Sequence, residues 1–84
     1  MGPVSAADPV LETVRAAVRA AAPAFTGDDT TELILERVLD SLALVGVVAR
    51  LEHELGVSIR DTEVLPRNFH SVTAIRAFLA TKGR

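Results

Sequence analysis

Cysteine, tryptophan and tyrosine are absent from the 84 residues of this sequence, and the lack of cysteine excludes a whole group of chemistries. The chain can form no disulfide, and it offers no thiolate nucleophile and no sulfur ligand for a metal. Its two histidines, His53 and His70, are isolated in the sequence. Zinc sites need three or four converging ligands, so we expect no metal site.

Aromatic rings and excess positive charge are also scarce, and this disfavours nucleic-acid binding. Three phenylalanines are the only aromatic residues of the Phe, Trp and Tyr types, the formal net charge is −2, and the arginines are scattered. Nucleic-acid-binding proteins need basic patches for phosphates, and many stack aromatic rings on bases. We expect no nucleic-acid partner.

Long apolar runs are missing as well. No segment reaches the roughly 18 continuous apolar residues of a membrane span, and the N-terminus lacks the basic-then-apolar pattern of a signal peptide. We therefore expect a soluble cytoplasmic protein with no membrane partner. The hydrophobic fraction of 49% favours one folded domain with a modest core, too small for a deep enclosed pocket.

We predict a disordered lead-in at residues 1–7, one domain at residues 8–82 and a tail at residues 83–84. Asp8-Pro9 predicts a helix start, because Asp can cap the helix and Pro at the first helical position loses no hydrogen bond. This helix should run to about Ala22 and stop before Pro23. Its apolar residues recur at helical spacing: Val10, Leu11, Val14, Ala17, Val18 and Ala21.

A long connection should follow at residues 23–39, with a turn at residues 27–31 where Gly, Asp and Thr cluster. A short helical turn starting at Asp28 or Asp29 is one option for this stretch. The two acids suggest either a cation site or a solvated loop. We favour the solvated loop, because no third ligand converges.

The later part of this connection is too apolar to lie free in solvent. Long loops in small domains are usually functional or packed down. We therefore expect at least two of Leu33, Ile34 and Leu35 to pack beneath the helices, while the connection delivers the chain to Ser41.

Asp40-Ser41 predicts the start of a second helix, since either side chain at an N-cap accepts a hydrogen bond from a first-turn N–H. The helix should run from Leu42 to Leu55 and stop at Gly56. Helical spacing gives it a core stripe: Leu44, Val47, Val48, Leu51 and Leu55. The opposite face carries no formal charge and consists of Leu42, Val45, Gly46, Ala49 and His53.

The next stretch predicts an extended link and one short helical turn. The link at residues 56–60 should insert Ile59 into the core. The turn at residues 61–65 should end at Pro66, and Phe69 is a candidate core residue.

A final helix should be capped by Ser71 and run to about Lys82. Together these elements predict an all-α fold. It should be a small four-helix bundle of three main helices and one short helix, with a long loop between the first two.

Three stretches match the motifs of one known family. Asp40-Ser41-Leu42 opens a helix near the middle of the chain, residues 51–59 read LEHELGVSI, and residues 68–75 read NFHSVTAI. In this order and spacing they resemble the acyl carrier protein family, which includes aminoacyl, D-alanyl and peptidyl carriers. The resemblance covers residues 10–79, nearly the whole chain.

The resemblance implies that Ser41 carries 4′-phosphopantetheine, moved from coenzyme A by a phosphopantetheinyl transferase that Asp40 helps to dock. The thiol of the arm would hold an acyl or aminoacyl group as a thioester, which suits a chain without cysteine. The further partners implied are a loading ligase or acyltransferase and downstream synthase or modifying enzymes. We expect a monomer that is not an enzyme, because no base stands near Ser41 in the sequence.

The sequence departs from fatty-acid carriers in two ways. Val38 stands where those usually have glycine, and residues 33–42 (LILERVLDSL) are similar to a form found among discrete aminoacyl, D-alanyl and unusual-extender-unit carriers. Fatty-acid carriers also usually place acids along the outer face of this helix, which here has none. We therefore predict a carrier for polyketide, nonribosomal peptide or related secondary-metabolite assembly.

Partner enzymes should then contact the outer face of the second helix. The predicted partner-binding residues are Leu42, Val45, Gly46, Ala49, Glu52 and His53. Alternatives stay open: the preceding loop covers this face, Asp40 and Ser41 merely cap the helix, or His53 is an exposed spectator instead of tuning docking with pH. For the whole chain, the alternatives are an unmodified helical interaction module and a carrier in fatty-acid synthesis.

Overall fold

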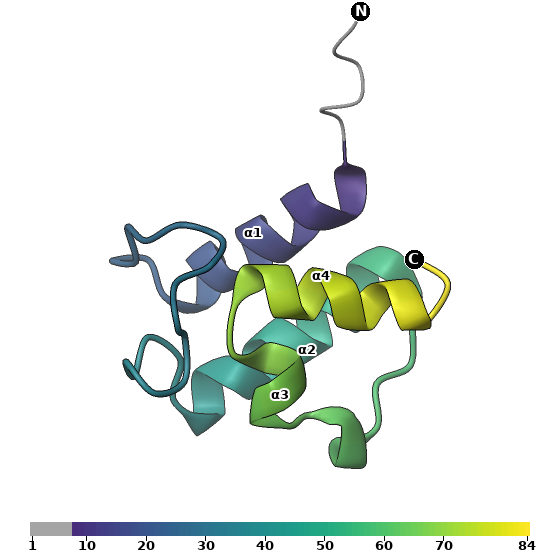
Figure 1. Ribbon diagram of the computed structural model, residues 1–84. Coiled ribbons are helices and arrows are strands. Elements are labelled where there is room, and N and C mark those ends of the chain that lie inside the picture. Colours follow the sequence, from purple (N-terminus) through teal and green to yellow (C-terminus); the bar gives the residue numbers. More distant parts are fainter. Residues whose placement is uncertain (1–7) are drawn as a thin grey trace, which may run out of the picture.

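The computed structural model describes residues 8–84, so the lead-in predicted at residues 1–7 lies outside the described residues. This part of the chain forms four α-helices and a 3-10 turn, without a strand: α1 (Pro9–Ala21), α2 (Ser41–Leu55), η2 (Asp61–Glu63), α3 (Pro66–Phe69) and α4 (Val72–Thr81). The predicted all-α class is confirmed, with a long connection between α1 and α2 (Figure 1).

The three longer helices begin at the side chains that the sequence predicted. Each cap accepts the amide three residues ahead: Asp8 from Leu11 (3.1 Å), Asp40 from Ala43 (2.8 Å) and Ser71 from Ala74 (3.0 Å). At its other end α2 stops at Gly56, whose φ of 64° lies in the left-handed region that favours glycine. These boundaries are therefore fixed by local chemistry.

The core lies where α1 packs against both α2 and α4, with α3 packed on α4 (Figure 1). The predicted inner stripe of α2 faces it: Val47 and Leu51 are fully buried, and Leu44, Val48 and Leu55 pack against the same cluster. The other buried apolar residues are Val14, Ala17, Val18, Leu33, Leu39, Ile59, Phe69, Val72, Ile75, Phe78 and Leu79.

The prediction for residues 61–66 was wrong in one respect. η2 ends at Glu63, and Pro66 begins the one-turn helix α3 where the sequence predicted that it would only end a turn. Proline suits the first position of a helix, since the N–H it lacks would have no helical partner there. Ile59 and Phe69 are buried as predicted, so the core assignment in this region holds.

The long connection is anchored by its apolar residues. Leu33 is fully buried and Ile34 packs partly against the core, which confirms that at least two of the three apolar residues pack inward. Leu35 points outward and is 81% exposed. The Leu33 N–H donates to the His70 carbonyl at 2.7 Å and so joins the connection to the end of α3.

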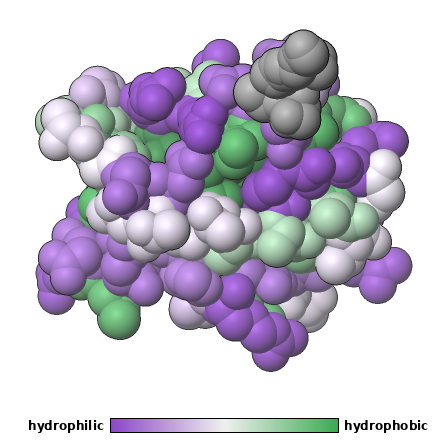
Figure 2. All heavy atoms as spheres, turned by 45° about the horizontal axis from the view of Figure 1, so that its top comes forward, coloured by the Kyte–Doolittle hydropathy of each residue, from purple (hydrophilic) through white to green (hydrophobic). Residues whose placement is uncertain are grey.

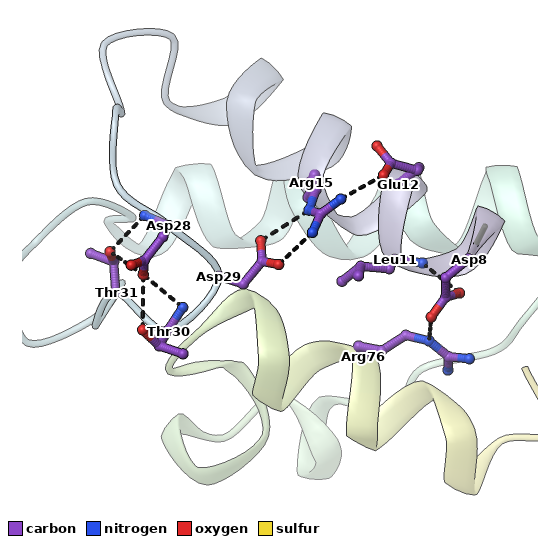
Figure 3. A network of polar contacts seen from close by, with 9 residues as sticks. All are labelled: Asp8, Leu11, Glu12, Arg15, Asp28, Asp29, Thr30, Thr31 and Arg76. Carbon is purple, nitrogen blue, oxygen red and sulfur yellow. Dashed lines mark hydrogen bonds and ion pairs between the residues drawn. The ribbon is translucent and has the colours of Figure 1, made fainter. Parts of the chain in front are cut away.

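Asp29 ties the first half of the connection to two helices, and Figure 3 shows its contact with Arg15 of α1. Its carboxylate accepts from Arg15 Nε at 3.0 Å and Nη2 at 2.6 Å, and its carbonyl accepts the N–H of Thr73 at 2.9 Å. The prediction of a solvated acid was therefore wrong for Asp29. Asp28 is exposed and instead caps the local turn, accepting the N–H of Thr30 at 2.9 Å; no helical turn forms there.

Polar side chains cover most of the molecular face drawn in Figure 2, and hydrophobic atoms reach that surface only in separate patches. Among residues 8–84, no helix has the length and apolar character needed to cross a bilayer. The apolar residues of the sequence are thus used mainly to fill the space between the helices.

The ion pair of Asp29 predicts a pH-dependent stability. The hydrogen bonds from Arg15 lower the pKa of the Asp29 carboxyl below its ordinary value. A carboxyl of lowered pKa contributes stability above its unfolded pKa, and this contribution is lost as pH falls through the folded pKa. We expect Asp29→Asn to lower the urea midpoint at pH 7, and the difference from wild type to shrink toward about pH 3.

The matched control for this measurement is Glu36→Gln, which removes an exposed carboxylate. It should leave the midpoint nearly unchanged at both pH values. Equal midpoints for Asp29→Asn and wild type at pH 7 would contradict the role of Asp29 in holding the connection.

Candidate functional site

Ser41 is the first residue of α2, and it is exposed at the corner where the long connection enters the helix. Asp40 precedes it as the N-cap with an extended backbone. None of the side-chain hydrogen bonds in the described part of the chain involves the Ser41 hydroxyl. The hydroxyl is therefore open to a second molecule.

Two backbone amides at this corner have no acceptor within the helix. The first helical bond of α2 runs from Leu44 N–H to the Asp40 carbonyl (2.9 Å), and the Asp40 carboxylate accepts the Ala43 N–H. The N–H groups of Ser41 and Leu42 come before these donors. Free amides at the positive end of a helix stabilise a phosphate. The corner therefore suits a phosphate ester on Ser41.

The outer face of α2 is open to solvent. Leu42 is 81% exposed and Val45 is 63% exposed, and Gly46, Ala49 and His53 are exposed as well. The alternative in which the preceding connection covers this face is therefore wrong. An uncovered apolar strip begins at the residue that follows Ser41.

Glu52, which the sequence placed among the partner-binding residues, has a structural contact. It is half-buried, and its carboxylate accepts the N–H of Ile59 at 2.9 Å, which ties α2 to the extended link after Gly56. A partner would compete with this hydrogen bond, so Glu52 is less free to bind than its neighbours. Helical spacing cannot reveal such a pair, because the path of the link decides it.

Sequence reasoning also missed Leu35 as a surface residue. Its neighbours Leu33 and Ile34 turn inward while Leu35 is exposed. Three consecutive apolar residues in a turn cannot all face the core. The sequence therefore indicates that one of them faces solvent, but it does not indicate which one.

Neither Asp40 nor His53 is placed to activate the Ser41 hydroxyl. Asp40 already accepts the Ala43 amide. His53 follows on α2 about 18 Å farther along the helix axis, at 1.5 Å per residue. Among residues 8–84, no three His, Asp or Glu side chains converge as a metal site would require. The corner thus offers a hydroxyl to an external enzyme.

Comparison with known families gives a match over most of the chain. The family model described as the phosphopantetheine attachment site matches residues 8–79, a span that contains α1, α2, α3 and most of α4. No curated protein and no solved structure matches the chain.

The hydrogen bond from the Ala43 amide to Asp40 predicts that the capping oxygen of Asp40, and not its charge, contributes most to the free energy of unfolding. Asp40→Ala removes the acceptor for the Ala43 amide and should lower the free energy of unfolding by about 1 kcal/mol. Asp40→Asn keeps a capping oxygen and should retain most of that stability. Urea unfolding of both variants measures the difference. Equal losses in the two variants would mean that the charge, and not the capping oxygen, stabilises the start of α2.

Proposed function

The chain belongs to the phosphopantetheine attachment site family, and from this premise we propose that Ser41 carries the arm. Proteins of this family bind 4′-phosphopantetheine covalently and act as carriers without catalysing a reaction. The chain is therefore a carrier protein that is not an enzyme. It holds a group on the arm and presents that group to enzymes.

The observation that carries the assignment to Ser41 is its position at an open helix start. Three serines lie in the described part of the chain. Ser71 is buried, and its oxygen caps α4 through the Ala74 amide. Ser58 is exposed but lies in the extended link after α2, and it neither caps nor begins an α-helix. Ser41 alone among these three combines exposure with free amides beside its oxygen.

The residues at the head of α2 would bind the phosphodiester end of the arm. The Ser41 oxygen would become the ester oxygen, and the N–H groups of Ser41 and Leu42 would stabilise the added negative charge. Asp40 would keep the helix end in place through its bond to Ala43, while a transferase docks beside it. The thiol at the far end of the arm supplies the thioester chemistry that a cysteine-free chain lacks.

We further propose that partner enzymes read the outer face of α2 through apolar contacts. Leu42, Val45 and Ala49 are exposed there, and the first turn of α2 contains no acid. Transient interfaces are small, so a few buried apolar contacts decide their affinity. Fatty-acid carriers usually place acids on this face, so an apolar face favours a role in secondary-metabolite assembly, of the polyketide or nonribosomal peptide type, over fatty-acid synthesis.

Some properties stay predictions from the sequence. They are the cytoplasmic location, the monomeric state, and the loading ligase or acyltransferase and the synthase enzymes as partners. His53 is exposed on the outer face of α2, which suits either a residue without a role in docking or a residue that tunes docking with pH.

Intact-mass spectrometry tests the attachment. With coenzyme A, Mg²⁺ and a broad-specificity phosphopantetheinyl transferase, the wild type should gain one phosphopantetheine adduct and Ser41→Ala should gain none. Ser58→Ala, which removes another exposed serine, should be modified like the wild type. A folded wild-type chain that gains no mass would favour the unmodified interaction module. An adduct on Ser41→Ala would place the arm elsewhere.

A loading assay tests the docking face. Val45→Glu puts a charge on a side chain that is 63% exposed, so the fold should survive, but the charge must be desolvated when a partner covers it. We expect kcat/KM of the cognate loading enzyme to fall about tenfold or more. Ala80→Glu, on the exposed side of α4, is the matched control, and circular dichroism checks both folds. Unchanged loading of Val45→Glu would reject this face.

A further inference from the structure

One exposed apolar side chain lies outside α2, six residues before Ser41 in the sequence. Leu35 is 81% exposed, as much as Leu42, and with Val45 these are the large hydrophobic residues that stand out from the described surface. Isolated surface hydrophobics are ordinary. Here all three fall between residues 35 and 45, a stretch of the sequence that contains Ser41. This clustering suggests that the three residues serve one common binding surface.

Leu35 sits on a closed loop whose base belongs to the core. The Leu39 N–H donates to the Leu33 carbonyl at 2.9 Å, and the Leu33 N–H donates to His70. Leu33 and Leu39 are both buried. Leu39 is two residues before Ser41, so their Cα atoms lie within about 7.6 Å. The base of this loop, residues 33–39, is therefore next to the attachment serine.

Glu32 fixes the tip of the same loop. Its carboxylate accepts the N–H groups of Ile34 (3.0 Å) and Leu35 (3.1 Å), and these bonds lower the pKa of the Glu32 carboxyl, with Leu35 the larger cause. The Arg37 N–H closes the turn onto the Ile34 carbonyl at 3.0 Å, and Arg37 takes a φ of 59°. Leu35 is therefore held outward by an ordered backbone.

A shallow groove of ≈ 420 Å³ extends from Leu35 toward α3, where Pro66, Arg67 and His70 line its far side. The apolar surface at Leu35 is thus wider than one side chain. Leu35 protrudes beside this groove, and such a protrusion can pack into a complementary pocket of a partner.

The loop segment itself carries mainly negative charge, whereas Arg67 and His70 line the far side of the groove. Residues 32–41 contain three acids, Glu32, Glu36 and Asp40, and one base, Arg37, for a net charge of −2. A partner that covers Leu35 would meet this charge at the rim of the contact. Basic side chains in that position would steer the encounter.

We propose that Leu35 is an anchor for the phosphopantetheinyl transferase, and that it enters an apolar pocket of that enzyme bordered by basic side chains. The inference rests on the attachment of the arm at Ser41. An enzyme that reaches this hydroxyl must cover the surface around it, and the base of the loop that carries Leu35 ends two residues before Ser41. Because the backbone of Leu35 is already ordered, binding loses little conformational entropy.

Steady-state phosphopantetheinylation with coenzyme A and a broad-specificity transferase tests the anchor. Leu35→Ser should raise KM for the carrier about tenfold with kcat nearly unchanged, because the lost contact stabilises the bound carrier equally in the ground state and in the transition state. Leu35→Met keeps an apolar side chain and should stay within about twofold of wild type. Glu36→Gln should weaken the dependence of kcat/KM on salt.

Ala80→Ser is the matched control, because it makes an exposed apolar residue polar at a distance from Ser41. The Arg84 side chain donates to the Gly56 carbonyl at 3.2 Å, so the end of α4 lies at the opposite end of α2. This variant should be modified like the wild type.

The outcomes separate this proposal from the assignment of Ser41. A wild-type KM for folded Leu35→Ser overturns the anchor, while a single adduct on Ser41 still upholds the attachment. A wild-type chain that gains no adduct overturns both. A wild-type dimer in sedimentation that Leu35→Ser dissociates would show that a second copy covers Leu35, and it would also overturn the proposal.

Discussion

The hydrogen bond from the Leu33 amide to the His70 carbonyl is the contact on which the position of the serine depends. Leu33 is fully buried, and a buried peptide group needs a partner, so this bond cannot be exchanged for water without opening the core. It joins the long connection to the end of α3. From this fixed point the chain closes its loop at Leu39, and Asp40 then begins α2.

The two faces of α2 have different roles. Val47 and Leu51 hold the helix in the core, while the outer face is left apolar and open. Gly46 lies in this open face, where an added Cβ would meet nothing within 4 Å. Glycine inside a helix costs about 1 kcal/mol relative to alanine. Packing within the described chain does not require this glycine, whereas close approach of a partner backbone would use it.

Local chemistry explains what the sequence predicts well. Asp8, Asp40 and Ser71 begin their helices because each accepts an amide three residues ahead, and no distant residue is needed for that. The sequence does not show the contacts that separate segments make. Asp29 meets Arg15 across the connection and Glu52 meets the amide of Ile59, and neither pair has a sequence period. Pro66 was ambiguous for a local reason, since proline both ends and begins helices.

The open corner also shows why a carrier needs a rigid base. The arm is flexible, so an enzyme can find it only through the protein surface that surrounds its attachment. The proposed surface has two parts, one on each side of Ser41 in the sequence: the loop that carries Leu35, and the outer face of α2. One enzyme must add the arm, and others must load and unload it. These enzymes can contact the two parts to different extents. One small domain can then bind them in turn, because each enzyme must reach the attachment site but need not contact the same surrounding residues.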